Sequence, residues 1–187
     1  MQRQALTAFL RGKWNLTKTL DYKVGGGVGH FTGAAIFDPW SAPPKDPEYH
    51  HQAGVTSVNG GAEGSSPSED ESWLNYSEEG HMILEGSAGP TAPMPCKTQH
   101  AYRCDVCPME VYFVGPGDGR KTAAGTISYL FHTLNLDQSQ ADEFFHPCPP
   151  DQYFGSFRVL GEDSFQLSWR ILGPHKDGLI VGTYTRS

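Results

Sequence analysis

The sequence has no apolar run approaching the roughly 20 residues that a membrane-spanning helix needs. Its beginning, MQRQAL, also lacks the apolar region of a secretory signal, so we expect a cytoplasmic protein without a membrane span. Basic residues are scarce: 14 Lys and Arg against 21 Asp and Glu give a formal net charge of −7. Without clustered cations to neutralise phosphates, nucleic acid and anionic membrane surfaces are not expected partners.

Cysteine is also sparse, with four residues that we expect to be free thiols in a cytoplasmic chain. Cys104 and Cys107 have the spacing of a zinc-ligand pair, but a structural zinc site needs four ligands and the sequence has no second such pair. The adjacent His50 and His51 predict no specific metal site. A nucleophile motif, a phosphate loop and a paired-carboxylate signature are absent as well, so no catalytic residue or cofactor is assigned.

The composition instead favours many short strands and turns. There are 22 glycines and 14 prolines, with 37% apolar and 12% aromatic residues, in 187 residues. No internal repeat or βαβ alternation is visible, and a short helix is predicted at 2–11. Roughly ten strands are predicted, at about 14–24, 30–38, 73–79, 81–86, 98–106, 109–114, 126–134, 143–148, 152–160, 164–172 and 179–186.

One segment departs from this pattern. Residues 41–72 are rich in Pro, Gly, Ser, Asp and Glu and contain almost nothing apolar. Such a segment cannot bury enough surface to offset its ordering entropy. We therefore predict one domain over 1–187 with a flexible insertion at 41–72.

The two ends of the chain carry a signal for barrel closure. Between Ser164 and Ile171, apolar and polar residues alternate as in a half-buried antiparallel strand. Gly12-x-Trp14 opens the first strand and Arg186 ends the last, so the indole can plug one barrel end while the guanidinium lies across it. This combination resembles the signature of the calycins, the superfamily of lipocalins and fatty-acid-binding proteins.

Further motifs resemble a lipocalin-like family of unknown function. They are Tyr76-x-Glu78-x-Gly80, Tyr102-Arg103, Asp118-Gly119-Arg120, Phe131-His132, His146-x-Cys148-x-x-Asp151-x-Tyr153, Gly173-Pro174-x-Lys176-Asp177 and Tyr184-x-Arg186. The resemblance spans nearly the whole chain. It implies an all-β, up-and-down calycin-like barrel of eight to ten antiparallel strands with a short N-terminal helix, and it implies no particular activity.

Histidines form the main candidate site. His146 and Cys148 lie two residues apart, hence on one strand face, and Tyr153 follows closely. With His132 from a neighbouring strand they allow three interpretations: a buried hydrogen-bond network, a pocket with acid–base groups, or a transition-metal site.

Arginines are the second candidate feature. In small barrels that bind acidic lipids, an inward Arg and Tyr hold the carboxylate, because a guanidinium binds it through two hydrogen bonds. We expect at least one of Arg103, Arg158 and Arg170 to point inward. The predicted ligand-binding residues are Arg103, His132, His146, Cys148, Tyr153, Arg158, Trp169 and Arg170.

The leading hypothesis is therefore binding of a small apolar or amphipathic molecule, with an anionic or polar head, inside the barrel. A second hypothesis is an enzyme of isomerase, cyclase or lyase type that uses His and Tyr for proton transfer. A third is haem or transition-metal binding through a pocket His or Cys. The sequence predicts neither the ligand nor the oligomeric state.

Overall fold

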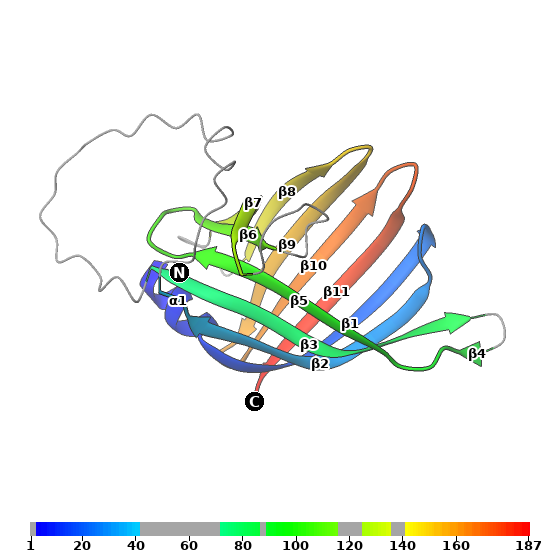
Figure 1. Ribbon diagram of the computed structural model, residues 1–187, viewed down its shortest axis with the longest axis horizontal. Helices are drawn as coiled ribbons and strands as arrows, with labels where there is room; N and C mark the ends of the chain where they lie inside the picture. Colours follow the sequence, from blue (N-terminus) through cyan, green and yellow to red (C-terminus); the bar gives the residue numbers. More distant parts are fainter. Residues whose placement is uncertain (1–2, 42–71, 87–88, 116–124, 136–140) are drawn as a thin grey trace, which may run out of the picture.

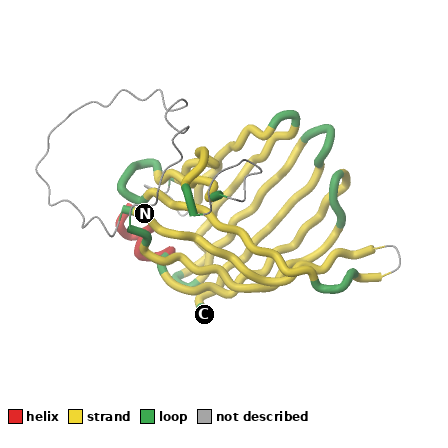
Figure 2. Tube along the Cα trace, in the orientation of Figure 1, coloured by secondary structure: helices red, strands yellow, loops and turns green. Residues whose placement is uncertain are grey.

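A computed structural model describes residues 3–41, 72–86, 89–115, 125–135 and 141–187 as one helix and an antiparallel sheet (Figures 1 and 2). The elements are α1 (Arg3–Leu10), β1 (Gly12–Val24), β2 (Val28–Pro39), β3 (Trp73–Gly86), β4 (Gly89–Pro90), β5 (Met94–Arg103), β6 (Met109–Val114), β7 (Ile127–Leu134), β8 (Ala141–Cys148), β9 (Asp151–Gly161), β10 (Ser164–Leu172) and β11 (Asp177–Arg186). Among these residues, no helix has the length and apolar character to cross a membrane.

The strands form a nearly closed barrel. Hydrogen-bonded neighbours follow the order β7-β6-β5-β3-β2-β1-β11-β10-β9-β8, and the short β4 pairs with β3 alone. The two end strands, β7 and β8, lie side by side, and a hydrogen bond of 2.8 Å joins His146 Nδ1 of β8 to the carbonyl of Phe131 in β7. The predicted all-β antiparallel barrel with a short N-terminal helix is confirmed.

The strand boundaries differ from prediction mainly at Gly80. Residues 73–79 and 81–86 were expected as separate strands, but they form the single strand β3, in which Gly80 pairs with Gly33 of β2. A Cβ at Gly80 would come within 2.4 Å of the Thr32 carbonyl oxygen. This glycine therefore permits a close approach of two strands rather than a turn.

Closure at the α1 end follows the predicted pairing of Trp14 with Arg186. Trp14 is fully buried, and its indole donates a hydrogen bond of 2.8 Å to the Leu10 carbonyl at the end of α1. The guanidinium carbon of Arg186 lies 3.7 Å from the Trp14 ring centroid. Arg186 also donates to the carbonyls of Phe9 and Arg11, each at 2.7 Å, so it satisfies acceptors at the helix terminus.

The opposite end of the barrel carries hairpin turns. The β1–β2, β8–β9 and β10–β11 turns lie there, away from α1 (Figure 1). Three predicted features cannot be compared with the structure, because residues 42–71 of the insertion, His50-His51 within it, and Asp118-Gly119-Arg120 lie outside the described residues.

Candidate functional site

Inward-facing side chains are buried at the α1 end of the barrel and partly exposed toward the other end. On the inward face of β1, Trp14 and Leu16 are buried, whereas Lys18, Leu20 and Tyr22 are partly exposed. Inward positions of other strands toward this end are partly exposed too. They include Cys96, Thr98, His100, Phe131, Phe144, Tyr153, Leu167 and Trp169. Solvent therefore reaches these inward-facing side chains, and we call the part of the interior that they line the cup.

Rings line the side of the cup where β7 and β8 meet. Phe131 stacks on Trp169 with centroids 4.9 Å apart, and His132 stacks on Phe144 at 4.1 Å. The ring cluster consists of His100, Phe113, Phe131, His132, Phe144, His146, Tyr153 and Trp169. Stacked and edge-to-face contacts are the favourable arrangements for such rings, so this wall can accept a further flat ring system.

Local sequence explains two of these placements. Phe144 lies flat against β9 because its register partner is Gly155, where a Cβ would come within 2.0 Å of the ring. The β6–β7 pairing shifts register just after the residue opposite His132. As a result the consecutive residues Phe131 and His132 both contact Trp169, although strict alternation would separate them.

His132 and His146 are both uncharged at neutral pH. Their Nδ1 atoms lie 3.1 Å and 2.8 Å from the carbonyls of Thr133 and Phe131, respectively. Because a carbonyl only accepts, Nδ1 carries the proton and Nε2 keeps a lone pair. Burial lowers the pKa of His132 to about 3, and burial also lowers the pKa of His146. Each imidazole is therefore a neutral hydrogen-bond acceptor through Nε2.

His100 lies between the ring cluster and a group of polar side chains around Glu78, which we call the floor of the cup. It stacks on Phe131 on one side and on Tyr76 on the other, with centroids 5.2 and 5.9 Å apart. Burial lowers the pKa of His100 to about 4, although the charge of Glu78 opposes this shift. Its Nδ1 is buried and has no hydrogen-bond partner of good geometry within the described part of the chain.

A charged pair forms the floor. Lys18 Nζ lies 2.6 Å and 2.7 Å from the two carboxylate oxygens of Glu78. The Tyr76 hydroxyl donates to Glu78 at 2.5 Å and lies 3.0 Å from the Tyr184 hydroxyl. Burial alone would raise the pKa of Glu78, but attraction to Lys18 and the hydrogen bonds from Lys18 and Tyr76 lower it overall. The floor is therefore polar and carries no net charge.

Two sequence motifs meet at the open end of the cup, which we call the rim. One motif contains Asp151 and Tyr153, and the other contains Gly173 and Lys176. The Asp151 Oδ1 atom accepts hydrogen bonds from the backbone amides of His175 and Lys176, at 3.1 and 3.3 Å. Gly173 makes room for this carboxylate, since a Cβ there would lie 2.1 Å from the same oxygen. The turn thus held places Lys176 Nζ 2.9 Å from the Tyr153 hydroxyl.

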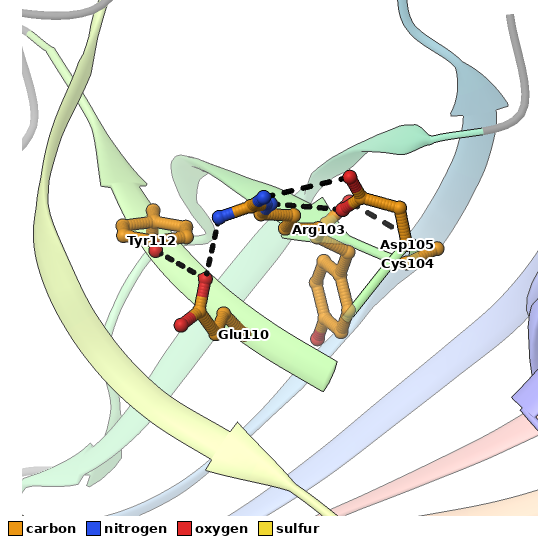
Figure 3. Close-up of polar contacts among 6 residues, drawn as sticks. Arg103, Cys104, Asp105, Glu110 and Tyr112 are labelled. Atoms are coloured by element: carbon orange, nitrogen blue, oxygen red, sulfur yellow. Dashed lines mark hydrogen bonds and ion pairs between the residues drawn. The ribbon is translucent and has the colours of Figure 1, made fainter. Parts of the chain in front are cut away.

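The three candidate arginines do not enter the cup, so the prediction of an inward arginine is wrong. Arg103 binds Asp105 at 2.8 Å and Glu110 at 3.5 Å on the outer face (Figure 3). Arg158 is exposed, and Arg170 donates to two backbone carbonyls and pairs with Asp177 at 2.5 Å. Strand alternation gives the inward places to their neighbours Tyr102, Phe157 and Trp169.

The structure also separates Cys148 from the histidines. His132 and His146 are only 5% and 8% exposed inside the barrel, whereas Cys148 is exposed at the rim. In the described ranges, no group of three His, Cys, Asp or Glu side chains could hold a metal ion. The geometry therefore does not assemble the three-ligand site that the metal hypothesis required. All four cysteines are free thiols, as predicted.

A depression of about 670 Å³ also lies against the wall formed by β1, β2, β3 and β5. Much of its lining consists of outward-facing side chains, and it reaches His100 and Phe113 where the β5–β6 pairing ends. Its ion pair, Lys97 with Glu79 at 3.0 Å, is largely exposed and contributes little energy. We assign the candidate site to the cup, where partly exposed aromatic rings meet the buried, neutral His132 and His146.

Sequence reasoning missed the polar floor, although its signal was present. Lys18 falls on the same alternating face as Trp14, Leu16 and Leu20, so strand alternation predicts a cation on the inner wall. Glu78 belongs to the motif Tyr76-x-Glu78-x-Gly80, but the motif alone did not predict that its carboxylate is buried. It shares an inward face with Tyr76, and the two together could have predicted a partner for an inward lysine.

The strand order and the partly exposed interior define a nearly closed antiparallel β-barrel. The chain belongs to the family of unknown function DUF6314, whose sequence profile matches residues 10–186. No significant relative was found among curated proteins.

One of the solved structures that this chain resembles supports the fold. An S-type phycobiliprotein lyase, CPES from Guillardia theta, is similar with a TM-score of 0.59 and 10% identity, covering 100% of this chain and 93% of the lyase. The protein EF1p2_mFAP2b bound to DFHBI gives a TM-score of 0.43 and 10% identity, covering 100% of both chains. A redesigned β barrel, mFAP1, also bound to DFHBI, gives 0.41 and 12%, covering 96% and 97%. Of the three, the lyase alone exceeds a TM-score of 0.5.

Proposed function

We propose that the protein binds a small, flat, conjugated or aromatic molecule in the cup, against the ring cluster. The observation that carries the proposal is the gradient of exposure inside the barrel. Rings at the α1 end, such as Trp14 and Phe165, are buried by their neighbours, whereas Trp169 and Phe144 face inward and keep contact with solvent. Covering such rings with a ligand removes apolar surface from water and is therefore favourable.

The polar groups refine the ligand class. Lys18 is neutralised by Glu78, so the floor offers no unpaired cation to a buried acid. Neutral His132 and His146 each supply an acceptor at Nε2, which suits a ligand with an N–H or O–H donor on its ring system. The expected ligand is thus neutral where it enters the interior. This revises the expectation of an anionic head held by an inward arginine.

The similarity to the lyase supports only the fold in this proposal, since 10% identity carries no information about the ligand. Acid–base catalysis would require His146 and Tyr153 to act together in the same site. Their ring centroids are 6.1 Å apart, and the Tyr153 hydroxyl is already bonded to Lys176. Catalysis would require these two side chains to be positioned for proton transfer, whereas ligand binding does not. Ligand binding is therefore the function that we propose.

Titration with the neutral dye N-phenyl-1-naphthylamine tests the proposal. The dye fluoresces when it leaves water, and its rings have the flat shape that the ring cluster should accept. We expect saturable binding with one dye per chain. Replacing Phe144 by Leu should weaken binding about two- to tenfold, because an aromatic contact contributes roughly 0.5–1.5 kcal/mol beyond its buried area.

Phe145→Leu is the matched control. Phe145 follows Phe144 in β8 but points outward, where it is 48% exposed and contacts Phe154. This variant should bind the dye as the parent does. Equal weakening by both substitutions, or weakening by Phe145→Leu alone, would place the dye on the outer wall and refute interior binding. Melting curves of both variants establish that each is folded.

A further inference from the structure

At the rim of the cup lies a cation, Lys176, that forms no ion pair with a carboxylate in the described part of the chain. Lys176 Nζ donates to the Tyr153 hydroxyl, and among the described residues no Asp or Glu forms an ion pair with it. The nearby acids are engaged elsewhere. Asp151 accepts from backbone amides of the turn, and Asp177 pairs with Arg170 at 2.5 Å. This lysine is partly buried, so its charge is less screened than that of a surface lysine.

Two tyrosines complete the cluster. Tyr153 accepts from Lys176, which leaves its own O–H free to donate toward a third group. Tyr22 lies opposite Gly178 in the β1–β11 pairing, two residues beyond Lys176, and burial raises its pKa. Its ring is fixed between glycines, because a Cβ at Gly26 or Gly178 would come within 2.7 or 2.5 Å of it. Two phenols and one ammonium thus lie together on the inner edge of the rim.

Contacts with the surrounding backbone hold this cluster in position. Asp151 holds the backbone of the turn that carries Lys176, and the β1–β2 turn packs against the same turn, since a Cβ at Gly25 would lie 2.0 Å from the His175 carbonyl oxygen. Positioned donors lose little entropy when they bind an anion. The net charge of −7 would otherwise repel an acidic ligand, so a local cation is needed to admit one.

We propose that Lys176, Tyr153 and Tyr22 form a subsite for an anionic oxygen group, so that the ligand is an aromatic or conjugated acid. The inference rests on the proposed function, because Tyr153 also belongs to the ring cluster, with its centroid 6.3 Å from that of Trp169. An acid group bound at the rim is therefore about one ring away from the aromatic wall. This matches a carboxylate or sulfonate attached directly to the ring system.

Two dyes with the same rings separate the two proposals. 1-Anilinonaphthalene-8-sulfonate carries the anion, and N-phenyl-1-naphthylamine lacks it. Lys176→Met should weaken binding of the sulfonate at least about tenfold, since hydrogen bonds to charged groups are worth roughly 1.5–3 kcal/mol, and should leave the neutral dye unchanged. Lys176→Arg should retain binding of the sulfonate. Tyr153→Phe, which removes only the hydroxyl, should weaken binding of the sulfonate a few-fold.

Lys23→Met is the matched control. Lys23 follows Tyr22 in β1 but is exposed on the outer face, so its loss changes the net charge equally without touching the subsite. The inference is overturned if Lys176→Met leaves sulfonate binding unchanged, if it weakens both dyes alike, or if Lys23→Met has the same effect. If the neutral dye fails to bind the parent protein, the proposed function fails, and this inference falls with it.

Discussion

Replacing His132 by Phe removes a base that the fold keeps uncharged. His132 is 5% exposed, and burial lowers its pKa from 6.5 to about 3. A depressed pKa means that the unfolded chain binds the proton more readily than the folded one. Stability from this group is therefore complete above pH 6.5 and is lost progressively as the pH falls toward 3.

The magnitude follows from the two pKa values. Between pH 7 and pH 5, the imidazole in the unfolded chain goes from about one quarter protonated to almost fully protonated, while the folded one stays neutral. The free energy of unfolding then falls by about 2 kcal/mol through His132 alone. The Phe variant lacks this loss. It retains the stacking position on Phe144 and gives up one hydrogen bond to a backbone carbonyl.

Urea denaturation followed by tryptophan fluorescence at pH 7, 6 and 5 provides the assay. The difference in unfolding free energy between variant and parent should shift by about 2 kcal/mol in favour of His132→Phe from pH 7 to pH 5. The other histidines are common to both chains and cancel. His81→Phe, at an exposed position of β3, is the control for the loss of one histidine. A difference that stays constant with pH would refute the claim that His132 is buried and neutral.

Two further predictions concern the framework of the barrel. Trp14→Ala removes a fully buried indole together with its contact to Arg186, and should destabilise the fold by roughly 3–5 kcal/mol, whereas a melting temperature within a degree or two of the parent would contradict the closure argument. Lys18→Met leaves the carboxylate of Glu78 buried without its cation and should also cost about 3–5 kcal/mol at pH 7, with most of this recovered in Lys18→Met/Glu78→Gln, because Gln keeps a hydrogen-bonding partner for Tyr76. If the double variant is no more stable than Lys18→Met in urea denaturation, the loss does not come from an uncompensated charge.

Alternation along strands predicted the architecture well, because a two-residue period fixes which side chains share a face. Phe165, Leu167, Trp169 and Ile171 all point inward as expected. The closing pair of Trp14 and Arg186 was predictable for the same reason, since the two residues terminate the first and last strands. The grouping of side chains was predicted in part, since His132, His146, Tyr153 and Trp169 lie in one ring cluster, and their role in ligand binding stays a prediction.

The other features of the site depend on strand pairing and register, which alternation along one strand does not determine. The parity that placed Trp169 inside also placed Arg170 outside, but the choice of face for Arg103 requires knowing how β5 pairs with β3 and β6. The register shift that brings Phe131 and His132 into one cluster has no local sequence signal. The meeting of Asp151 with the turn at Lys176 depends on the pairing of β9 with β10, which only the folded barrel supplies.

The most direct test of interior binding is an NMR measurement of contacts between the neutral dye and the protein. In a sample saturated with N-phenyl-1-naphthylamine, we expect intermolecular nuclear Overhauser effects from the dye to ring protons of Phe144, Trp169 and His132. None should reach the outward pair Phe145 and Phe154, whose exposed fractions are 48% and 43%. Overhauser effects confined to Phe145 and Phe154 would show that the dye binds the outer wall, and would contradict a binding site in the cup.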